Sequence, residues 1–293
     1  MTKDPAQEQG KKRNPGRNVP VAVGVGLGLA ALVIGSLAWH RQLFIPVLIL
    51  FGGVALRELS GGFAARNIRI PLGPVGIGGV AMLVAAYLRG TAGLVTALGL
   101  TVLVVLIWRM RDGAEGYVRD VTGSLFTLLY LPFLAAFTML MLWPGDGSRR
   151  IVVFVAVTVA SDIGGFFVGA YFGKHKFAPT ISPKKTWEGF AGSAVTCMAV
   201  GAWLLTWLLD AHWWQGVIVG ACVVVTATVG DLIESMIKRD LGVKDLGTLL
   251  PGHGGVMDRL DSLLIAAPVV WILLEVFTSS SNVFYSGSYT PLG

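Results

Sequence analysis

Long apolar runs separated by short polar segments dominate the chain from residue 20 onward. The runs are continuous rather than alternating, and most approach the roughly 20 residues that a helix needs to cross a bilayer. Since only helices and closed barrels satisfy backbone hydrogen bonds in lipid, the pattern predicts an all-α, polytopic membrane bundle. About nine transmembrane helices are expected, of which the second and third are short, over residues 20–38, 43–56, 75–88, 91–108, 120–143, 151–173, 188–209, 213–231 and 256–277.

Polar stretches at both ends suggest how the chain is organised. Residues 1–18 are basic and rich in helix breakers, which predicts a disordered cytoplasmic tail, and residues 278–293 predict a flexible tail. Between them, residues 19–150 form an N-terminal group of transmembrane helices, and residues 151–277 hold most of the unusual polar motifs. A basic start also occurs in signal peptides, but eight further spans and the lack of an Ala-x-Ala-like site favour an uncleaved first span.

Composition agrees with a membrane protein. The mean hydropathy is +0.70, and 54% of the residues are hydrophobic while 14% are charged. The two cysteines, Cys197 and Cys222, lie inside apolar runs and suggest neither a disulfide framework nor a zinc site.

Basic residues are distributed unevenly across the predicted spans. With a cytoplasmic N-terminus, 19 of the 23 Lys and Arg residues fall on the inner side. This asymmetry predicts a multi-pass protein of the cell (inner or plasma) membrane with its N-terminus inside. The net charge of +6 follows from this placement and needs no nucleic-acid partner.

The segment from Asp231 to Asp261 is the most polar part of the apolar region, with ten charged side chains. Asp231 and Glu234 are three residues apart, as are Asp258 and Asp261, so each pair shares a helical face. Both pairs fall at the predicted cytoplasmic ends of neighbouring helices, where their carboxylates can converge on Mg²⁺. The alternative is that these carboxylates pair locally with nearby Lys and Arg side chains.

A glycine-rich turn, Pro251-Gly-His253-Gly-Gly255, precedes the last span. Glycines let backbone amides approach an anion closely, and the following helix offers its N-terminus. His253 could act as a base, contact phosphate or shape the turn.

A second polar segment covers residues 173–189 and belongs to the same predicted face. Its lysines suit point-charge binding of polyphosphate, although an ordinary positive-inside loop would also contain lysines. Asp162 lies within the sixth span, where a carboxylate is either a functional group or a helix–helix hydrogen-bond partner. Gly165, Gly169 and Gly173 recur every four residues there and predict close helix packing.

Together these segments resemble the signature of the phosphatidate cytidylyltransferases, also called CDP-diacylglycerol synthases. The resemblance rests on Ser235-Met-Ile-Lys-Arg239, Lys244-Asp245, Pro251-Gly-His-Gly-Gly-Val-Met-Asp-Arg-Leu-Asp261, Ser182-Pro-Lys-Lys-Thr186 and the Asp162 region. It covers mainly residues 155–265, whereas the first 150 residues match only in their multi-span character.

The resemblance implies transfer of a cytidylyl group from CTP to phosphatidate, giving CDP-diacylglycerol and pyrophosphate for phospholipid synthesis. It also implies Mg²⁺ dependence, with a second cation left open, and a homodimer in the membrane. The CTP and lipid site would then lie in the region 151–277. By matched position, Asp231 and Asp258 are the expected metal ligands. The catalytic candidates are Asp231, Asp258, Asp261, Lys238 and Arg239. The substrate-binding candidates are Asp162, Ser182, Lys184, Lys185, Thr186, Lys244, His253 and Arg259.

The residue types agree with this reaction. Phosphatidate is a phosphomonoester with a second pKa near 6, so it is largely dianionic at neutral pH and needs no general base. Charge neutralisation by metal and Lys/Arg groups is the main requirement. Other CTP-dependent membrane enzymes, such as a polyprenol kinase or a cytidylyltransferase for ether-linked lipids, remain alternatives. An ion-coupled transporter using Asp162 and Asp231 is the alternative from another class, but the charged residues gather on one face.

Overall fold

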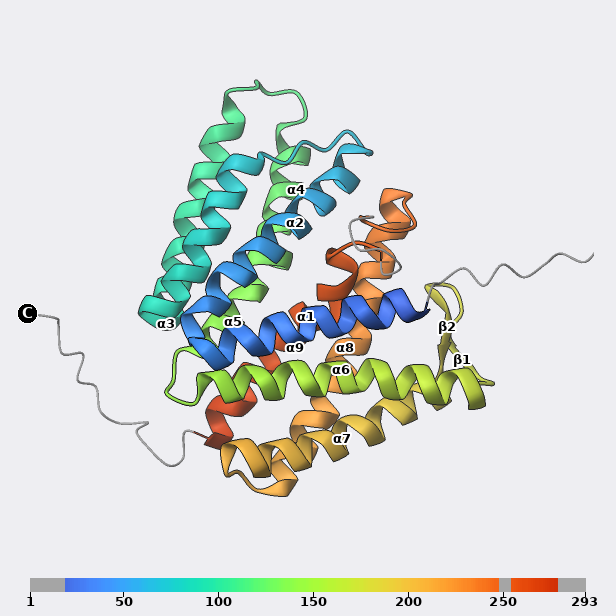
Figure 1. Cartoon of the computed structure of the whole chain (residues 1–293). Helices are drawn as coiled ribbons and strands as arrows, with labels where there is room; N and C mark the ends of the chain where they lie inside the picture. The colour runs from blue at the N-terminus through green and yellow to red at the C-terminus, as the bar shows by residue number, and fades with distance from the viewer. Residues whose placement is uncertain (1–18, 248–253, 279–293) are drawn as a thin grey trace, which may run out of the picture.

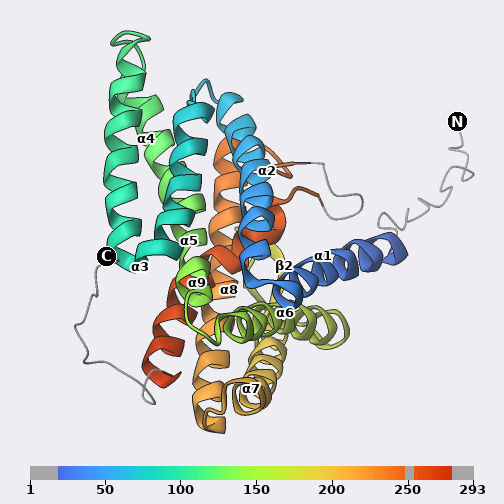
Figure 2. The same cartoon turned by 60° about the vertical axis from the view of Figure 1, so that its left-hand side comes forward.

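The computed structural model describes residues 19–247 and 254–278, without the side chains of residues 183 and 184 and of several residues near the start of the first helix. The predicted tail 1–18 and nearly all of the predicted tail 278–293 lie outside this part. Helices form almost all of the described fold, as two views of the chain show (Figure 1 and Figure 2). The elements are α1 (Val19–Trp39), η1 (Arg41–Leu43), α2 (Phe44–Ala64), α3 (Leu72–Met110), α4 (Tyr117–Leu128), η2 (Leu129–Phe133), α5 (Leu134–Leu142), α6 (Gly147–Phe172), β1 (Lys176–Ala178), β2 (Ser182–Thr186), α7 (Trp187–Leu209), α8 (Trp213–Leu241) and α9 (Met257–Thr278).

The all-α membrane architecture is confirmed. Within the described residues, seven helical segments are long and apolar enough to cross a membrane. One of them joins η1 to α2, and another runs from α4 through η2 to α5. α1 adds a shorter apolar stretch, Gly28–Trp39. The count of nine crossings therefore stays a prediction.

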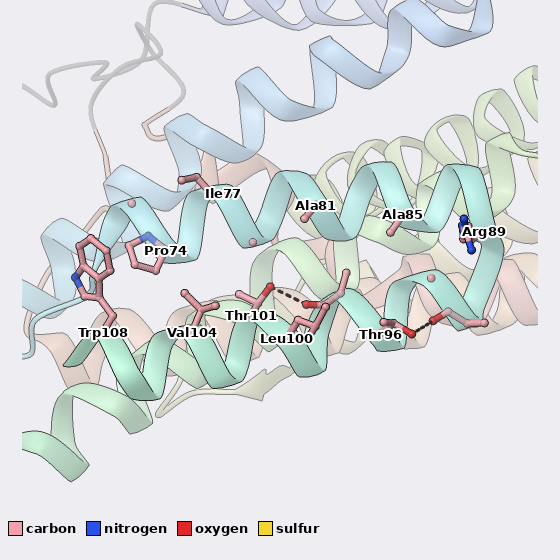
Figure 3. Close-up of a pocket in the computed structure, with 15 residues that line it drawn as sticks. Pro74, Ile77, Ala81, Ala85, Arg89, Thr96, Leu100, Thr101, Val104 and Trp108 are labelled. Atoms are coloured by element: carbon pink, nitrogen blue, oxygen red, sulfur yellow. Dashed lines mark hydrogen bonds between the residues drawn. The ribbon is translucent and has the colours of Figure 1, made fainter. Parts of the chain in front are cut away.

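α3 contains two of the predicted spans, 75–88 and 91–108. Its backbone is not helical at Gly90, where φ is 64° and ψ is −149°. This left-handed region is open to glycine at little cost, so the chain reverses there. Figure 3 shows the two limbs of α3 lying side by side, with Arg89 near the end where they join. Each limb is about 27 to 30 Å long at the helical rise per residue.

Two helices are longer than their apolar runs predict. The second span was expected to be short and to end at residue 56, but α2 continues to Ala64 and includes Arg57 and Glu58. The eighth span was expected to end at residue 231, but α8 continues to Leu241 and is followed by Gly242, which has a φ of 73°. Hydropathy marks where charges begin, whereas a helix ends at a breaker such as this glycine.

The predicted packing role of the glycines on α6 is confirmed. A β-carbon on Gly165 would lie 2.5 Å from the hydroxyl of Ser193 on α7, and one on Gly173 would lie 2.8 Å from the hydroxyl of Thr186. On the facing helix, a β-carbon on Gly189 would lie 3.1 Å from the carbonyl oxygen of Gly165. The two helices approach closely because these side chains are absent.

The polar segment between α6 and α7 forms a small antiparallel hairpin that the sequence did not predict. β1 pairs with β2 in a register that places Lys176 opposite Thr186 and Ala178 opposite Ser182. Thr186 is also the N-cap of α7, because its hydroxyl accepts a hydrogen bond from the amide of Gly189 at 3.2 Å. The hairpin thereby holds its lysines next to the start of α7.

Exposed tryptophans mark several helix ends. Trp39 ends α1, Trp143 follows α5, Trp207 lies near the end of α7, and Trp213 begins α8. All four helix ends belong to the side that the Lys and Arg distribution predicts to be outside. Amphipathic indole rings are typical of the membrane–water interface, so these ends fit one edge of a bilayer.

Candidate active site

The carboxylates of α8 and α9 gather where α8 ends and α9 begins. Lys238 lies between them: its ammonium group donates hydrogen bonds to Glu234 at 2.6 Å and to Asp258 at 2.8 Å. Glu234 and Lys238 are one helical turn apart, whereas Asp258 comes from the first turn of α9. Lys238 therefore joins α8 to α9 through Asp258, and both carboxylates that it contacts are almost fully buried.

A second group of contacts surrounds Asp231. The hydroxyl of Ser262 on α9 donates a hydrogen bond to Asp231 at 2.7 Å, and it also lies 3.5 Å from Asp261. On its other oxygen, Asp231 accepts a hydrogen bond from the ammonium group of Lys185 in β2. Thus the hairpin, α8 and α9 meet at Asp231. The structure brings together Asp231 and Asp261, which the sequence placed on separate helices.

A cavity of about 510 Å³ opens beside this group. Lys185 and Asp231 line it together with Asp162 of α6, which is exposed to the cavity. Ser182 and Thr186 of the hairpin lie along the same wall. Apolar side chains cover much of the remainder, from Phe166, Ala170, Phe177, Phe190 and Ala227. A polar end beside an apolar wall suits a ligand with a charged head and an apolar body.

A larger cavity, of about 670 Å³, lies between the two limbs of α3 (Figure 3). Small and apolar side chains form most of its wall, and Arg89 is the one charged residue among those that line it. It shares no lining residue with the cavity at Asp231. We therefore place the candidate chemistry at the smaller cavity, where lysines and carboxylates meet.

The donor atoms at this site fit Mg²⁺ in part. No group of three His, Cys, Asp or Glu side chains in the described ranges is arranged to hold one ion. Mg²⁺, however, takes one or two protein carboxylates and completes its shell with water and substrate phosphates. Two buried polar atoms have no hydrogen-bond partner in the part of the chain that the structure describes, Glu234 Oε1 and the hydroxyl of Tyr130. The free oxygen of Glu234 is a suitable ligand for a hard cation. Both oxygens of Asp231 and of Asp258, the expected ligands, already accept hydrogen bonds from the protein, so they would exchange these for a bound ion.

Several predicted residues lie at the edge of this site. Arg239, Lys244 and Arg259 are exposed around the junction of α8 and α9. They do not line the cavity at Asp231. The side chain of Lys184 and all of His253 lie outside the described residues, so their predicted roles stay predictions.

The start of α9 differs from the expected anion site. The backbone amides at its start already donate hydrogen bonds to the protein's own carboxylates. Asp258 accepts a hydrogen bond from the amide of Gly255 at 2.8 Å. Glu58 of α2 accepts hydrogen bonds from the amides of Val256 at 3.1 Å and Met257 at 2.8 Å. A phosphate could reach these amides only by displacing a carboxylate.

Three of these residues were not identified from the sequence: Glu58, Ser262 and Tyr130. Ser262 follows Asp261 directly, so its place in a charged helical turn was a usable signal. Glu58 lies next to Arg57, two residues past the predicted end of an apolar run, and an acidic residue so close to the membrane span was a usable signal as well. Tyr130 lies in the π-helical turn η2, a feature that often marks functional sites but that has no sequence signature apart from Pro132.

Taken together, the fold and this site define a multi-pass membrane protein with lysines and carboxylates gathered at one end of its helices. The chain belongs to the cytidylyltransferase family, whose model matches residues 20–277. It is 37% identical to the phosphatidate cytidylyltransferase of Mycobacterium leprae (strain TN), over 92% of this chain and 93% of that protein. It is 36% identical to the phosphatidate cytidylyltransferase of Mycobacterium bovis (strain ATCC BAA-935 / AF2122/97), over 94% of this chain and 97% of that protein. A protein of the same name from Synechocystis sp. (strain ATCC 27184 / PCC 6803 / Kazusa) is 28% identical over 91% of this chain and 98% of its own length.

Proposed function

We propose that this enzyme transfers the cytidylyl group of CTP to phosphatidate, forming CDP-diacylglycerol and pyrophosphate. The observation that carries the proposal is the contact between Lys185 and Asp231 at the polar end of a cavity with an apolar wall. Such a cavity can hold a phosphate group next to cations while an acyl chain lies against phenylalanine and alanine side chains. The family and its phosphatidate cytidylyltransferase members support the same reaction.

The reaction joins two anions. A phosphate oxygen of phosphatidate attacks the α-phosphorus of CTP and forms the new P–O–P bond. The bond from the α-phosphorus to the bridging oxygen of the β-phosphate breaks, and that oxygen leaves with pyrophosphate. Because the attacking phosphate is already ionised, its charge has to be neutralised and its position fixed, but no proton has to be removed.

The chain's own residues can supply these two effects. Lys185 lines the cavity, and Lys238 pairs with Glu234 and Asp258 beside it. Both are partly buried cations, and such a positive charge stabilises charge that develops on phosphate oxygens. Asp162 and Ser182 line the same cavity and can orient a bound substrate. We propose that Asp231 and Asp258 hold Mg²⁺ together with substrate phosphates. When bound, Mg²⁺ would neutralise phosphate charge and orient the leaving group.

The protein is embedded in a membrane, and its bacterial relatives imply the plasma membrane. We propose further that the N-terminus and the site face the cytoplasm, since 19 of 23 basic residues fall on that side and CTP is a cytoplasmic nucleotide.

A homodimer is proposed from the family resemblance alone. The mass of the purified protein in detergent, measured by light scattering, tests it directly.

A comparison of lipid acceptors tests the substrate assignment. Purified full-length protein is incubated with CTP and Mg²⁺ and with phosphatidate, an ether-linked glycerol phosphate lipid or a polyprenol. We expect a CDP-lipid from phosphatidate and little product from the other two acceptors. Preferential use of the ether lipid or the polyprenol would replace phosphatidate as the substrate.

A further inference from the structure

Glu58 connects the N-terminal half of the chain to the start of α9, next to the candidate active site. It lies on α2, yet its carboxylate accepts hydrogen bonds from the amides of Val256 and Met257 at the start of α9, at 3.1 and 2.8 Å. The first amides of a helix have no partner within the helix, and the helix dipole favours negative charge there. Glu58 thus caps a helix that lies almost 200 positions further along the chain.

The surrounding backbone leaves space for this carboxylate. A β-carbon on Gly255 would lie 2.6 Å from Glu58 Oε2, and a β-carbon on Gly247 would collide with Oε1. Both positions therefore need glycine for the carboxylate to come this close. The carboxylate of Glu58 therefore lies beside the chain at two points, at Gly247 after the end of α8 and at Gly255 before the start of α9.

α2 supports the same region one turn further on. A β-carbon on Gly62 would lie 2.9 Å from Leu241 and 3.2 Å from Leu246, which are both buried. Glu58 and Gly62 are four residues apart and share one face of α2. This face therefore packs against the end of α8 and the start of α9.

The capped turn carries the residues proposed to act in the reaction. Asp258 accepts a hydrogen bond from the amide of Gly255, directly before the two amides that Glu58 holds. The other oxygen of Asp258 contacts Lys238 at 2.8 Å. Asp261 lies one turn later, so a shift of the first turn would move both carboxylates. A displacement of about 1 Å at a reacting centre can lower the rate about 100-fold.

We propose that Glu58 is a positioning residue, which fixes the first turn of α9 so that Asp258 and Asp261 are held for the reaction. The inference rests on the proposed function for its effect on turnover. It extends the site to the N-terminal half of the chain, outside the signature segments. Glu58 acts through the backbone of α9, so it is not a catalytic residue.

The variant Glu58→Gln tests the proposal, with Glu115→Gln as the matched control because Glu115 is exposed in the loop between α3 and α4. Glutamine keeps one oxygen acceptor but directs an NH₂ group at the second amide and loses the charge. We expect kcat to fall about 10-fold or more, with a smaller change in the KM for CTP. Hydrogen–deuterium exchange should become faster at residues 255–258, while α3 and α6 keep wild-type exchange. Glu58→Asp should be intermediate, because the shorter side chain keeps the charge.

Hydrogen exchange separates this inference from the proposed function, because it requires no substrate. If wild-type protein shows no cytidylyl transfer, the proposed function fails, while unchanged exchange at residues 255–258 in Glu58→Gln would overturn the role of Glu58. Faster exchange there with unchanged kcat would also overturn it. A uniform increase in exchange and a lower melting temperature, with kcat per folded molecule retained, would reduce Glu58 to a general stabilising contact.

A second variant keeps the test open if Glu58→Gln does not fold. Gly247→Ala keeps the glutamate at position 58 but puts a methyl group where its carboxylate lies, so the carboxylate has to move. We expect the same local increase in exchange and the same fall in kcat. Wild-type exchange at residues 255–258 and wild-type kcat in Gly247→Ala would contradict the positioning role of Glu58.

Discussion

Lys185 in β2 and Asp231 in α8 form an ion pair that ties the hairpin to the carboxylates of the helical bundle. The two residues are 46 positions apart, and each came from a different polar segment of the sequence. Asp231 also accepts a hydrogen bond from Ser262 of α9, so three elements meet at one carboxylate. The lysine therefore compensates the charge of Asp231, and because it lines the adjoining cavity we propose that it contacts a substrate phosphate there.

Replacing Lys185 should weaken transfer more than replacing another lysine of the hairpin. Lys185→Met removes the charge at the cavity, and we expect kcat/KM for CTP to fall by roughly 10². Lys176→Met is the control, because Lys176 is exposed on β1 and does not line the cavity. Steady-state rates of both variants are compared at saturating phosphatidate. If the Lys185→Met value stays within twofold of the control, the lysine does not act on the substrate.

The metal assignment predicts large effects at two aspartates. Asp231→Asn and Asp258→Asn should each lower turnover by at least about 10²-fold, as expected when one preorganised electrostatic contact is lost. Both variants should still insert and purify, since removing a charge near the bilayer adds no insertion cost. Asp240→Asn is the control at an exposed site near the end of α8. Near-normal turnover of either variant at saturating Mg²⁺ would contradict the assignment.

Orientation can be measured with single cysteines. In a background of Cys197→Ala and Cys222→Ala, we expect an impermeant thiol reagent added outside intact cells to label Gly145→Cys and spare Glu115→Cys. Gly145 lies between α5 and α6, and Glu115 lies between α3 and α4; both are exposed. Labelling after cell lysis controls for access to each thiol. The reverse pattern would mean that the distribution of Lys and Arg misassigns the cytoplasmic side.

The pH dependence separates the lipid phosphate from His253. Protonation of phosphatidate below its second pKa near 6 weakens the nucleophile, so the rate should fall as the pH decreases through this range. His253→Gln should keep measurable activity and the same acidic limb, because the amide still donates a hydrogen bond. The comparison is made at saturating Mg²⁺, so that metal binding does not shape the profile. Loss of the acidic limb in the variant would identify the imidazole as the titrating group.

The all-α membrane architecture could be predicted from the sequence for a physical reason. Crossing a bilayer requires long apolar helices, and that requirement is visible in hydropathy. The helical spacing of Asp231 with Glu234, and of Asp258 with Asp261, also holds in α8 and α9. Hydropathy placed the end of α8 too early, because the apolar run stops at the first carboxylate although the helix continues to Leu241.

Contacts between distant segments could not be read from the sequence. Glu58 lies just past the predicted end of the second span, residue 56, and its role depends on where α2 packs relative to α9. The pairing of Lys185 with Asp231 likewise depends on a hairpin whose short strands carry little β signal. Spacing within one helix is set locally, whereas these contacts are set by tertiary packing.

The fate of each phosphate of CTP tests the central claim most directly. Purified full-length protein is incubated with phosphatidate and CTP labelled at the α- or the γ-phosphate, with and without Mg²⁺. Cytidylyl transfer predicts that α-label enters the lipid fraction, that γ-label leaves in pyrophosphate in equal amount, and that both require Mg²⁺. Label from the γ-phosphate in the lipid would indicate a kinase, and no α-label in the lipid would contradict the proposed reaction.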